Sequence, residues 1–353
     1  MTVGPQVRAA EIERPRSRMY REAAQSPDVI ARQLAVNRLL VRNIAAGLRE
    51  RRPRAVVTGA RGSSDNAATF ARYLIETKTG ILTSSTGLSV SSVYATQANF
   101  DDVLFLAISQ SGRSPDLLAT VTSARAGGAH VVALVNDAAS PLAALAHDVL
   151  PLGAGTETSV AATKTHLAST AAIADLVCAW TQDGELAEAL ARLPDDLRRA
   201  WDCDWTAAAA VLTDARDLYT IGRGFGFGAA QEMALKFKET SGLHAEAFSS
   251  AEVLHGPMAL VKDGFPVLML SQRDETRPGL EELATRLVAA GANLMVAGFG
   301  VPGATVLPTV PAHPVLEPIL MTQSFYRMID SLARARGFDP DRPPNLIKVT
   351  ETF

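Results

Sequence analysis

An internal repeat is the feature that most constrains the fold of this 353-residue chain. Ser109-Gln110 follows one short apolar segment, and Ser271-Gln272 follows another, so that the residue numbers of the two turns differ by 162. The numbers of Gly62 and Gly224 differ by the same amount, and those of a third pair of matching segments differ by 163. An offset that stays nearly constant over three such units indicates that one folding unit occurs twice along the chain.

Each repeat alternates strand-length apolar segments with helical stretches. In the first repeat Ala55–Gly59, Val103–Ile108 and Val131–Val135 are each followed by a polar turn and a helical pattern. This order is typical of a parallel sheet with helices on both faces. We therefore predict an α/β protein of two tandem, doubly wound domains. The predicted parts are a disordered segment (1–25), a first domain with a leading helix (26–185), a linker helix region (186–211), a second domain (212–335) and a tail (336–353).

Composition narrows the classes of partner. The formal net charge is −3 and no basic stretch stands out, which argues against binding to nucleic acid or to a membrane surface. Cys178 and Cys203 form neither a disulfide framework nor a metal-binding motif. The N-terminus lacks the apolar core of a signal peptide, so we expect a cytoplasmic protein.

A polar turn follows the predicted strand Val103–Ile108, at the end where parallel sheets bind ligands. It reads Ser109-Gln110-Ser111-Gly112-Arg113-Ser114-Pro115-Asp116. Ser114 can cap the next helix, Pro115 fits its first position, and Gly112 permits close approach of a ligand. The free N–H groups at the helix start, the serine hydroxyls and the glutamine amide together suit a phosphate group. An ordinary helix-capping turn would use the same residues, so the turn alone leaves both interpretations open.

The second repeat contains a glycine string, Gly222-Arg223-Gly224-Phe225-Gly226-Phe227-Gly228-Ala229. It includes Gly-x-Gly-x-x-Ala, a pattern found in dinucleotide-binding turns. No acidic residue ends a second strand about 20 positions later, which such a site requires. We therefore predict close packing of a helix against a strand in preference to a nicotinamide site.

Three charged residues share one face of a predicted helix in the second repeat. Glu232, Lys236 and Glu239 are spaced i, i+4 and i+7. Spacing alone favours a solvated face with ordinary ion pairs. A histidine in a Gly-Pro turn, His255, and the motif Glu157-Thr158-Ser159-Val160-Ala161-Ala162-Thr163-Lys164 point instead to a site.

Taken together, these motifs resemble the sugar isomerase (SIS) module of glucosamine-6-phosphate synthase. The resemblance runs from about residue 45 to the C-terminus, and it includes the tail motif Pro344-Asn345-Leu346-x-Lys348. It implies two tandem SIS domains and a homodimer in which the neighbouring subunit supplies a histidine to the active site. It also implies a sugar phosphate as the substrate, and no metal or organic cofactor.

The resemblance assigns roles residue by residue. Glu239 would move a proton between C1 and C2 of the sugar, His255 would open the sugar ring, and Lys348 would form a Schiff base. Residues implied to hold the phosphate are Gly62, Ser63, Ser64, Ser109, Gln110, Ser111 and Ser114. Residues implied to line the rest of the site are Glu157, Val160 and Lys236, and the C-terminal tail would close it.

Departures from the synthase pattern shape the expected activity. The synthase begins with a glutaminase domain that has an N-terminal cysteine, whereas this chain begins Met1-Thr2-Val3. We therefore expect deamination and isomerisation of glucosamine 6-phosphate to fructose 6-phosphate and ammonia, as in stand-alone double-SIS deaminases. Arg61 and Arg113 also depart from the pattern, which leaves the sugar's stereochemistry open.

Four alternatives remain. Three are enzymes: a fructosamine-phosphate deglycase, a galactosamine-6-phosphate deaminase and an aldose–ketose isomerase. The fourth is a non-catalytic sugar-phosphate sensor. Sensors of this type usually carry a DNA-binding domain, and only the stretch before about residue 45 precedes the first repeat here, which is too short for one.

Overall fold

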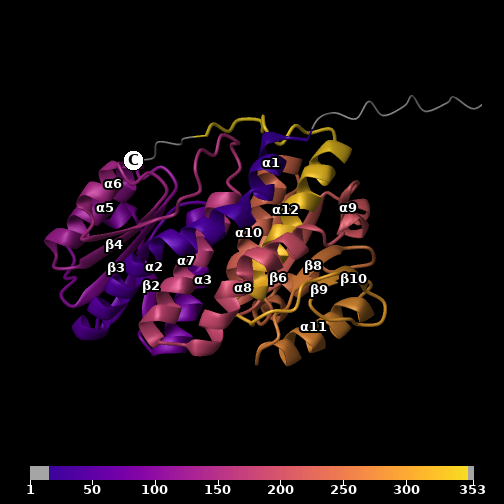
Figure 1. Ribbon diagram of the computed structural model, residues 1–353. Helices are drawn as coiled ribbons and strands as arrows, with labels where there is room; N and C mark the ends of the chain where they lie inside the picture. Colours follow the sequence, from indigo (N-terminus) through magenta and orange to yellow (C-terminus); the bar gives the residue numbers. More distant parts are fainter. Residues whose placement is uncertain (1–15, 349–353) are drawn as a thin grey trace, which may run out of the picture.

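Two parallel five-stranded sheets form the protein, and helices cover both of them (Figure 1). The computed structural model describes residues 16–348. The strand order is β2-β1-β3-β4-β5 in the first sheet and, read in the matching direction, β7-β6-β8-β9-β10 in the second. The predicted pair of doubly wound α/β domains is therefore confirmed.

The elements of the first half follow one another as strand and helix. They are α1 (Arg18–Ala24), α2 (Ser26–Arg51), β1 (Ala55–Gly59), α3 (Ser63–Thr79), β2 (Thr83–Ser85), α4 (Ser89–Ser92), β3 (Val103–Ser109), α5 (Pro115–Ala126), β4 (His130–Val135), α6 (Pro141–Leu145), β5 (Asp148–Pro151) and α7 (Lys164–Thr181). Strands β3 and β4 are almost wholly buried, as the sequence pattern of continuous apolar segments predicts.

The linker helices and the second half follow. They are α8 (Gly184–Trp201), α9 (Thr206–Leu212), β6 (Asp217–Gly222), α10 (Phe225–Ser241), β7 (His244–Ser249), the short 3₁₀ helices η1 (Glu252–His255) and η2 (Pro257–Leu260), β8 (Pro266–Leu270), α11 (Arg277–Ala289), β9 (Asn293–Ala297), β10 (Thr305–Leu307) and α12 (Glu317–Ala335). None of the helices within residues 16–348 is long and apolar enough to cross a membrane.

The constant offset of the repeat holds in three dimensions. Both ends of helices α3 and α10 are related by it, and the β1–β3 and β6–β8 pairs keep the same register at this offset. Gly62 and Gly224, which precede the two helices, have nearly the same backbone angles, with φ of 55° and 57°. A positive φ favours glycine, which explains why the repeat keeps glycine at both positions.

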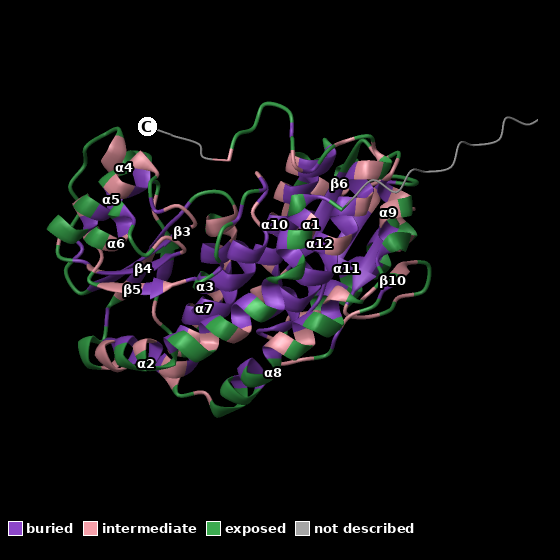
Figure 2. Ribbon diagram, turned by 45° about the horizontal axis from the view of Figure 1, so that its top comes forward, coloured by how far each residue is buried: buried purple, intermediate pink, exposed green. Residues whose placement is uncertain are grey.

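Helices from both halves meet in the middle of the molecule. Helix α10 packs against α3 and α12, and α7 packs against α2 and α3. Figure 2 shows α3, α7, α10 and α12 largely buried, whereas α2 and α8 expose one face. At Gly228 of α10 a Cβ atom would lie 2.6 Å from the Asn66 carbonyl oxygen of α3, and at Gly222 it would overlap the backbone of Gly226. The glycine string is thus used for close packing.

Helix α1 lies beside α12 and contacts the tail that follows it. Residues 18–24, predicted to be disordered, form helix α1 and pack against α12; the prediction was wrong there because packing, and not local composition, stabilises so short a helix. Residues 1–15 and 349–353, which belong to the predicted N-terminal segment and tail, lie outside the described residues. Figure 1 shows the tail running from the end of α12 back over the first half.

Candidate active site

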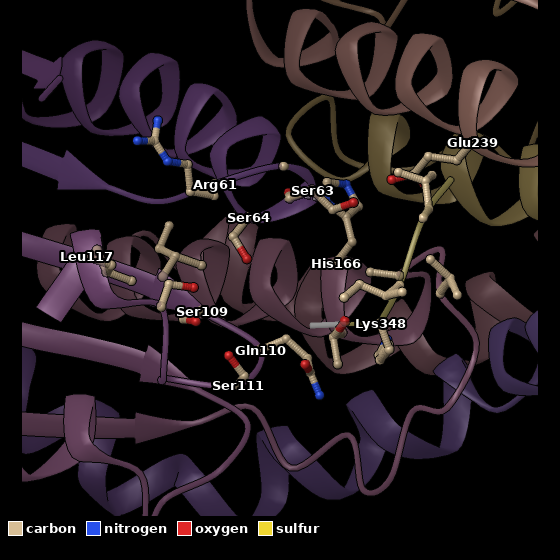
Figure 3. Close-up of a pocket in the computed structure, with 18 residues that line it drawn as sticks. Arg61, Ser63, Ser64, Ser109, Gln110, Ser111, Leu117, His166, Glu239 and Lys348 are labelled. Atoms are coloured by element: carbon tan, nitrogen blue, oxygen red, sulfur yellow. Dashed lines mark hydrogen bonds between the residues drawn. The ribbon is translucent and has the colours of Figure 1, made fainter. Parts of the chain in front are cut away.

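A cavity of about 340 Å³ opens at the carboxyl ends of β1 and β3 (Figure 3). After these two neighbouring strands the chain continues in opposite directions along the strand order: β2 lies beside β1 at one edge, and β4 lies beside β3 toward the other edge. Such a switch point is where open α/β sheets bind their ligands. The cavity is also bordered by α10, by the start of α7 and by the C-terminal tail.

Ten of the thirteen site residues predicted from the sequence line this cavity. They are Gly62, Ser63, Ser64, Ser109, Gln110, Ser111, Ser114, Val160, Glu239 and Lys348. Figure 3 shows Ser109 and Ser111 toward one end of the cavity and Glu239 toward the other. Segments that are far apart in sequence, from the loop after β1 to the C-terminal tail, therefore meet at one site.

The serine turn after β3 presents unused donors to the cavity. Ser114 occupies the N-cap position of α5, but its side chain makes no capping hydrogen bond. Ser109 Oγ accepts a hydrogen bond from the N–H of Gly112 at 3.0 Å, and Gly112 has a φ of 63°. The turn is thereby fixed with the N-terminus of α5 beside the cavity, an arrangement that suits an anion.

Arg61 is held beside this turn by a buried carboxylate. Its Nε and Nη2 atoms donate to Asp116 Oδ2 at 2.9 and 2.7 Å, and the Asp116 side chain is 1% exposed. Arg61 lines the cavity and is half exposed. The pairing reduces the net positive charge that Arg61 brings to the site.

The charged face of α10 is buried, so the alternative of a solvated face is wrong for two of its three residues. Glu232 and Lys236 are fully buried, and Glu239 is largely so. Lys236 Nζ lies 3.2 Å from Glu232 Oε1 and 2.5 Å from Glu239 Oε2. It also donates to Ser63 Oγ at 2.9 Å, which links α10 to the loop after β1.

Both charges of the buried pair are stabilised by their neighbours. Burial alone raises the pKa of Glu232, but Lys236, His166 and hydrogen bonds from Asn66 and Tyr326 outweigh it and lower that pKa. Burial alone lowers the pKa of Lys236, but Glu232 and Glu239 outweigh it and raise that pKa. Lys236 therefore stays charged and holds the Glu239 carboxylate at the edge of the cavity.

Glu157 lies behind the cavity wall, at the start of α7. It accepts hydrogen bonds from the N–H groups of Thr163 and Thr165 at 3.0 and 3.2 Å, and from Thr165 Oγ1 at 2.6 Å. Its carboxylate is 3.5 Å from Lys348 Nζ. Glu157 therefore holds Lys348 of the tail against the first half. Glu157 and Lys236 contact residues of the cavity but do not line it.

The two histidines differ in position. His255 ends the short helix η1, is exposed, and does not line the cavity of its own chain. Its predicted contribution from a neighbouring subunit stays a prediction. His166, which the sequence analysis missed, does line the cavity; its Nδ1 lies 2.9 Å from the Ser63 carbonyl oxygen and 3.9 Å from Glu232. Its place two positions after Lys164 is the sole sequence signal.

Residues 16–348 contain no group of three or more His, Cys, Asp or Glu side chains placed to hold a metal ion. What the cavity offers chemically is a carboxylate, a primary amine and an anion-binding turn. These groups suit proton transfer and imine formation on a small phosphorylated carbonyl compound.

The profile of the SIS domain matches residues 47–179 and 211–297, which together make up more than half of the chain. The chain belongs to the SIS-domain family. This SIS protein is 37% identical over 324 residues to a glutamine–fructose-6-phosphate aminotransferase (isomerizing) from Aeropyrum pernix, with 86% of this chain covered. It spans 52% of that relative, and about half the length of the other aminotransferases of this kind that it matches.

Solved structures agree with the assignment to the SIS family. A protein from Silicibacter pomeroyi DSS-3, provisionally classed as a phosphosugar isomerase, superimposes with a TM-score of 0.89 at 43% identity. That match covers 92% of this SIS protein and 100% of the other chain. A glucosamine-6-phosphate deaminase from Thermotoga maritima has a TM-score of 0.74 at 20% identity over 95% of this chain and 100% of its own, a likeness that shows the shared fold alone.

Proposed function

We propose that this SIS protein converts glucosamine 6-phosphate and water to fructose 6-phosphate and ammonia. The observation that carries the proposal is that the Glu239 carboxylate and the Lys348 amine border the same cavity as the serine turn after β3. An anion-binding turn fixes the phosphate end of a sugar, and a carboxylate some distance away can then act on its first two carbons.

The phosphate is bound first by residues of the first half. Backbone N–H groups at the start of α5 and the hydroxyls of Ser111 and Ser114 donate hydrogen bonds to its oxygens. The amide of Gln110 and the hydroxyl of Ser64 add two further donors. Net positive charge is small here, because Asp116 pairs with Arg61. Binding therefore depends on directed hydrogen bonds and the helix dipole.

Proton transfer follows ring opening. Glu239 removes the C2 proton of the open-chain aldehyde, which gives an enolamine between C1 and C2 as the aldehyde oxygen takes up a proton. Return of a proton to C1, with loss of one from nitrogen, leaves an imine at C2. Lys236 keeps the Glu239 carboxylate directed at the cavity through its 2.5 Å contact.

Release of ammonia completes the reaction. Water can add to the C2 imine and expel ammonia, leaving the ketone of fructose 6-phosphate. Alternatively, Lys348 displaces ammonia from the imine, and water then hydrolyses the new imine to regenerate the lysine. The 3.5 Å contact between Lys348 and Glu157, beside the cavity, supports this second route.

An ammonia-coupled assay with purified protein tests the proposal. The panel contains glucosamine 6-phosphate, galactosamine 6-phosphate, a fructosamine 6-phosphate, and glucosamine without phosphate. We expect ammonia and fructose 6-phosphate from the first compound and very little from the last. Ammonia release from the galactosamine or fructosamine compound instead would identify one of the other two amine-releasing reactions.

A second candidate function is aldose–ketose isomerisation without an amine, which the 43% identity to the Silicibacter protein provisionally classed as a phosphosugar isomerase favours. It uses the same carboxylate but has no use for an imine at Lys348. Isomerisation of an aldose 6-phosphate, with no ammonia from any amino sugar, would establish it. A further arm with fructose 6-phosphate and glutamine measures the synthetic direction, and amino-sugar formation there would contradict the proposal.

A further inference from the structure

Helix α1 contacts both segments that bring Glu157 and Lys348 together. Its C-terminal end faces the loop between β5 and α7, which carries Glu157, and its N-terminal end faces the tail, which carries Lys348. Neither segment is close to α1 in sequence, because the contacts join Glu22 to Thr158 and Arg18 to Asp341.

Glu22 is the main contact of α1 with the loop. Its carboxylate accepts four hydrogen bonds: Thr158 N–H at 2.6 Å, Thr158 Oγ1 at 2.9 Å, Ser159 N–H at 3.1 Å and Ser159 Oγ at 2.6 Å. The residue is 7% exposed. A buried carboxylate is costly unless every oxygen is satisfied, and here both oxygens are. Glu157 precedes these two residues directly, and Val160 of the cavity wall follows them.

The tail is held at the other end of the helix. Asp341 accepts hydrogen bonds from the N–H groups of Arg18 and Met19 at 2.7 and 3.1 Å, which caps α1. Leu346, Ile347 and Lys348 then line the cavity a few residues later. The position of α1 therefore affects the loop and the tail together.

A third contact fixes the start of α7. Gln25, which directly follows α1, accepts a hydrogen bond from Lys164 Nζ at 2.9 Å, and the same Nζ donates to the Thr156 carbonyl at 2.7 Å. Gln25 contacts Thr156, the residue before Glu157, only through Lys164, whereas α1 contacts the two residues after Glu157 directly.

We propose that α1 sets the distance between Glu157 and Lys348, and that Glu22 is the positioning residue through which it does so. The proposal rests on the proposed use of Lys348 and Glu157 in the reaction, but not on which sugar is the substrate. Glu22 touches no residue of the serine turn, so its effect is confined to the amine end of the cavity.

The experiment compares Glu22→Gln with a matched control, Glu317→Gln. Glu317 is also a buried carboxylate that accepts backbone N–H groups, from Arg273 at 2.7 Å and Ala312 at 3.3 Å, but it lies in the second half away from the cavity. Both variants keep the side-chain shape and lose part of their hydrogen bonds. We expect both to lower the thermal unfolding temperature to a similar extent.

Two readouts distinguish positioning from stability. Glu22→Gln should lower kcat about tenfold, because a misplaced amine reacts more slowly but cannot cost more than the loss of Lys348 itself. KM should change less than about threefold, since the serine turn is untouched. Lys348 should also be acylated faster by an amine-reactive reagent, because the 3.5 Å contact with Glu157 is loosened; mass spectrometry of the Lys348 peptide measures this without any substrate. Glu317→Gln should show neither change.

The outcomes separate this inference from the proposed function. If the parent protein releases no ammonia, the proposed function fails, while the acylation rate of Lys348 still decides whether Glu22 positions it. Equal acylation in the parent and in Glu22→Gln overturns the inference, as does an equal loss of activity in the two variants. Should Glu22→Gln not fold, Thr158→Val decides instead: Thr158 is exposed and loses one hydroxyl donor, so a smaller change in the same direction supports the inference and no change overturns it.

Discussion

The loops that follow β3 and β8 occupy equivalent positions in the two halves. The loop after β3 borders the cavity, whereas side chains of the loop after β8 bond to one another and to α12. In the first half the Ser114 side chain makes no capping hydrogen bond, and the cavity begins beside it. In the second half the corresponding Thr276 accepts a hydrogen bond from Gln272 Nε2 at 3.0 Å. Arg273, at the position of Ser111, donates to Glu317 at 2.8 Å. Side chains of the second loop thus satisfy the groups that the first loop leaves for a ligand.

Helices α3 and α10 differ in the opposite direction. When the two helices are aligned by the repeat, the positions of Glu232, Lys236 and Glu239 in α10 are taken in α3 by Phe70, Leu74 and Thr77. The first half therefore supplies the anion-binding turn, while the second half supplies the charged face of α10. The cavity is lined by residues of both halves, so neither half forms the site alone.

The largest effect is expected at the carboxylate that only the second half supplies. Glu239→Gln keeps the shape of the side chain and removes the base, and general base catalysis contributes about 10²–10⁴-fold. We expect kcat to fall by that amount while binding of fructose 6-phosphate, measured by calorimetry, stays near the parent value. Glu281→Gln, an exposed carboxylate of α11, is the control and should leave both unchanged. Substantial turnover by Glu239→Gln would move the role to Glu157 or Glu232.

A smaller effect is expected at Lys348, which the tail adds to the cavity. In the deaminase direction water can hydrolyse the imine directly, so Lys348→Ala should slow turnover about ten- to a hundredfold and keep more activity than Glu239→Gln. Borohydride with fructose 6-phosphate should label the parent and not the variant. Turnover by Lys348→Ala below that of Glu239→Gln would make the Schiff base obligatory and contradict the route through water.

The paired loops give the third prediction. Ser114→Ala removes a donor from a charged ligand, a loss worth roughly 1.5–3 kcal/mol, so KM should rise about tenfold or more. The matching Thr276→Ala disturbs Gln272 and Asp274 in the second loop and should lower stability without changing KM. Steady-state kinetics and thermal unfolding of both variants measure the contrast. Equal KM values for the two would mean that the first loop is a helix-capping turn and nothing more.

Much of this division could be predicted from the sequence, because it depends on residues that follow strands. The constant offset of the repeat identifies equivalent turns, and glycine at Gly62 and Gly224 reflects a positive φ that few other residues tolerate. The serine turn lines the cavity because it follows β3, and the carboxyl ends of parallel strands meet at one edge. Glu239 lies near the C-terminal end of α10, and the resemblance to the synthase module predicts its place in the site.

What could not be predicted depends on contacts between distant segments. His166 and Glu22 gain their places from packing between elements; no local pattern marks Glu22, and His166 is marked only by its place just after the motif that ends at Lys164. The prediction of disorder at α1 was wrong because the stability of this helix comes from packing against α12 and from capping by Asp341, and local composition shows neither contact. Lys236 and Glu157 were predicted to line the site, but they lie behind residues that line the cavity. Spacing along a helix predicts which face a residue occupies, but not how deeply that residue is buried.

The smallest effect on activity is expected at Asp175, where the two long helices that follow each sheet differ. Asp330 of α12 accepts hydrogen bonds from Ser17 and Arg334, whereas Asp175 of α7 has no hydrogen bond or ion pair with any residue in the described range 16–348. Burial raises the pKa of Asp175 to about 6, from an ordinary value of 3.8. A carboxyl whose pKa is raised by folding favours the folded state at low pH, and this contribution is lost as the pH rises toward and through 6.

Asp175→Asn should therefore gain stability relative to the parent as the pH increases, and the gap in free energy of unfolding should be about 1–2 kcal/mol larger at pH 8 than at pH 5. Denaturant titrations of both proteins at the two pH values measure the gap, with ammonia release expected to stay within about twofold because Asp175 lies outside the cavity. A difference in free energy of unfolding that does not vary with pH would mean that folding does not raise the pKa of Asp175. The missing partners of Asp175 would then have no effect on stability.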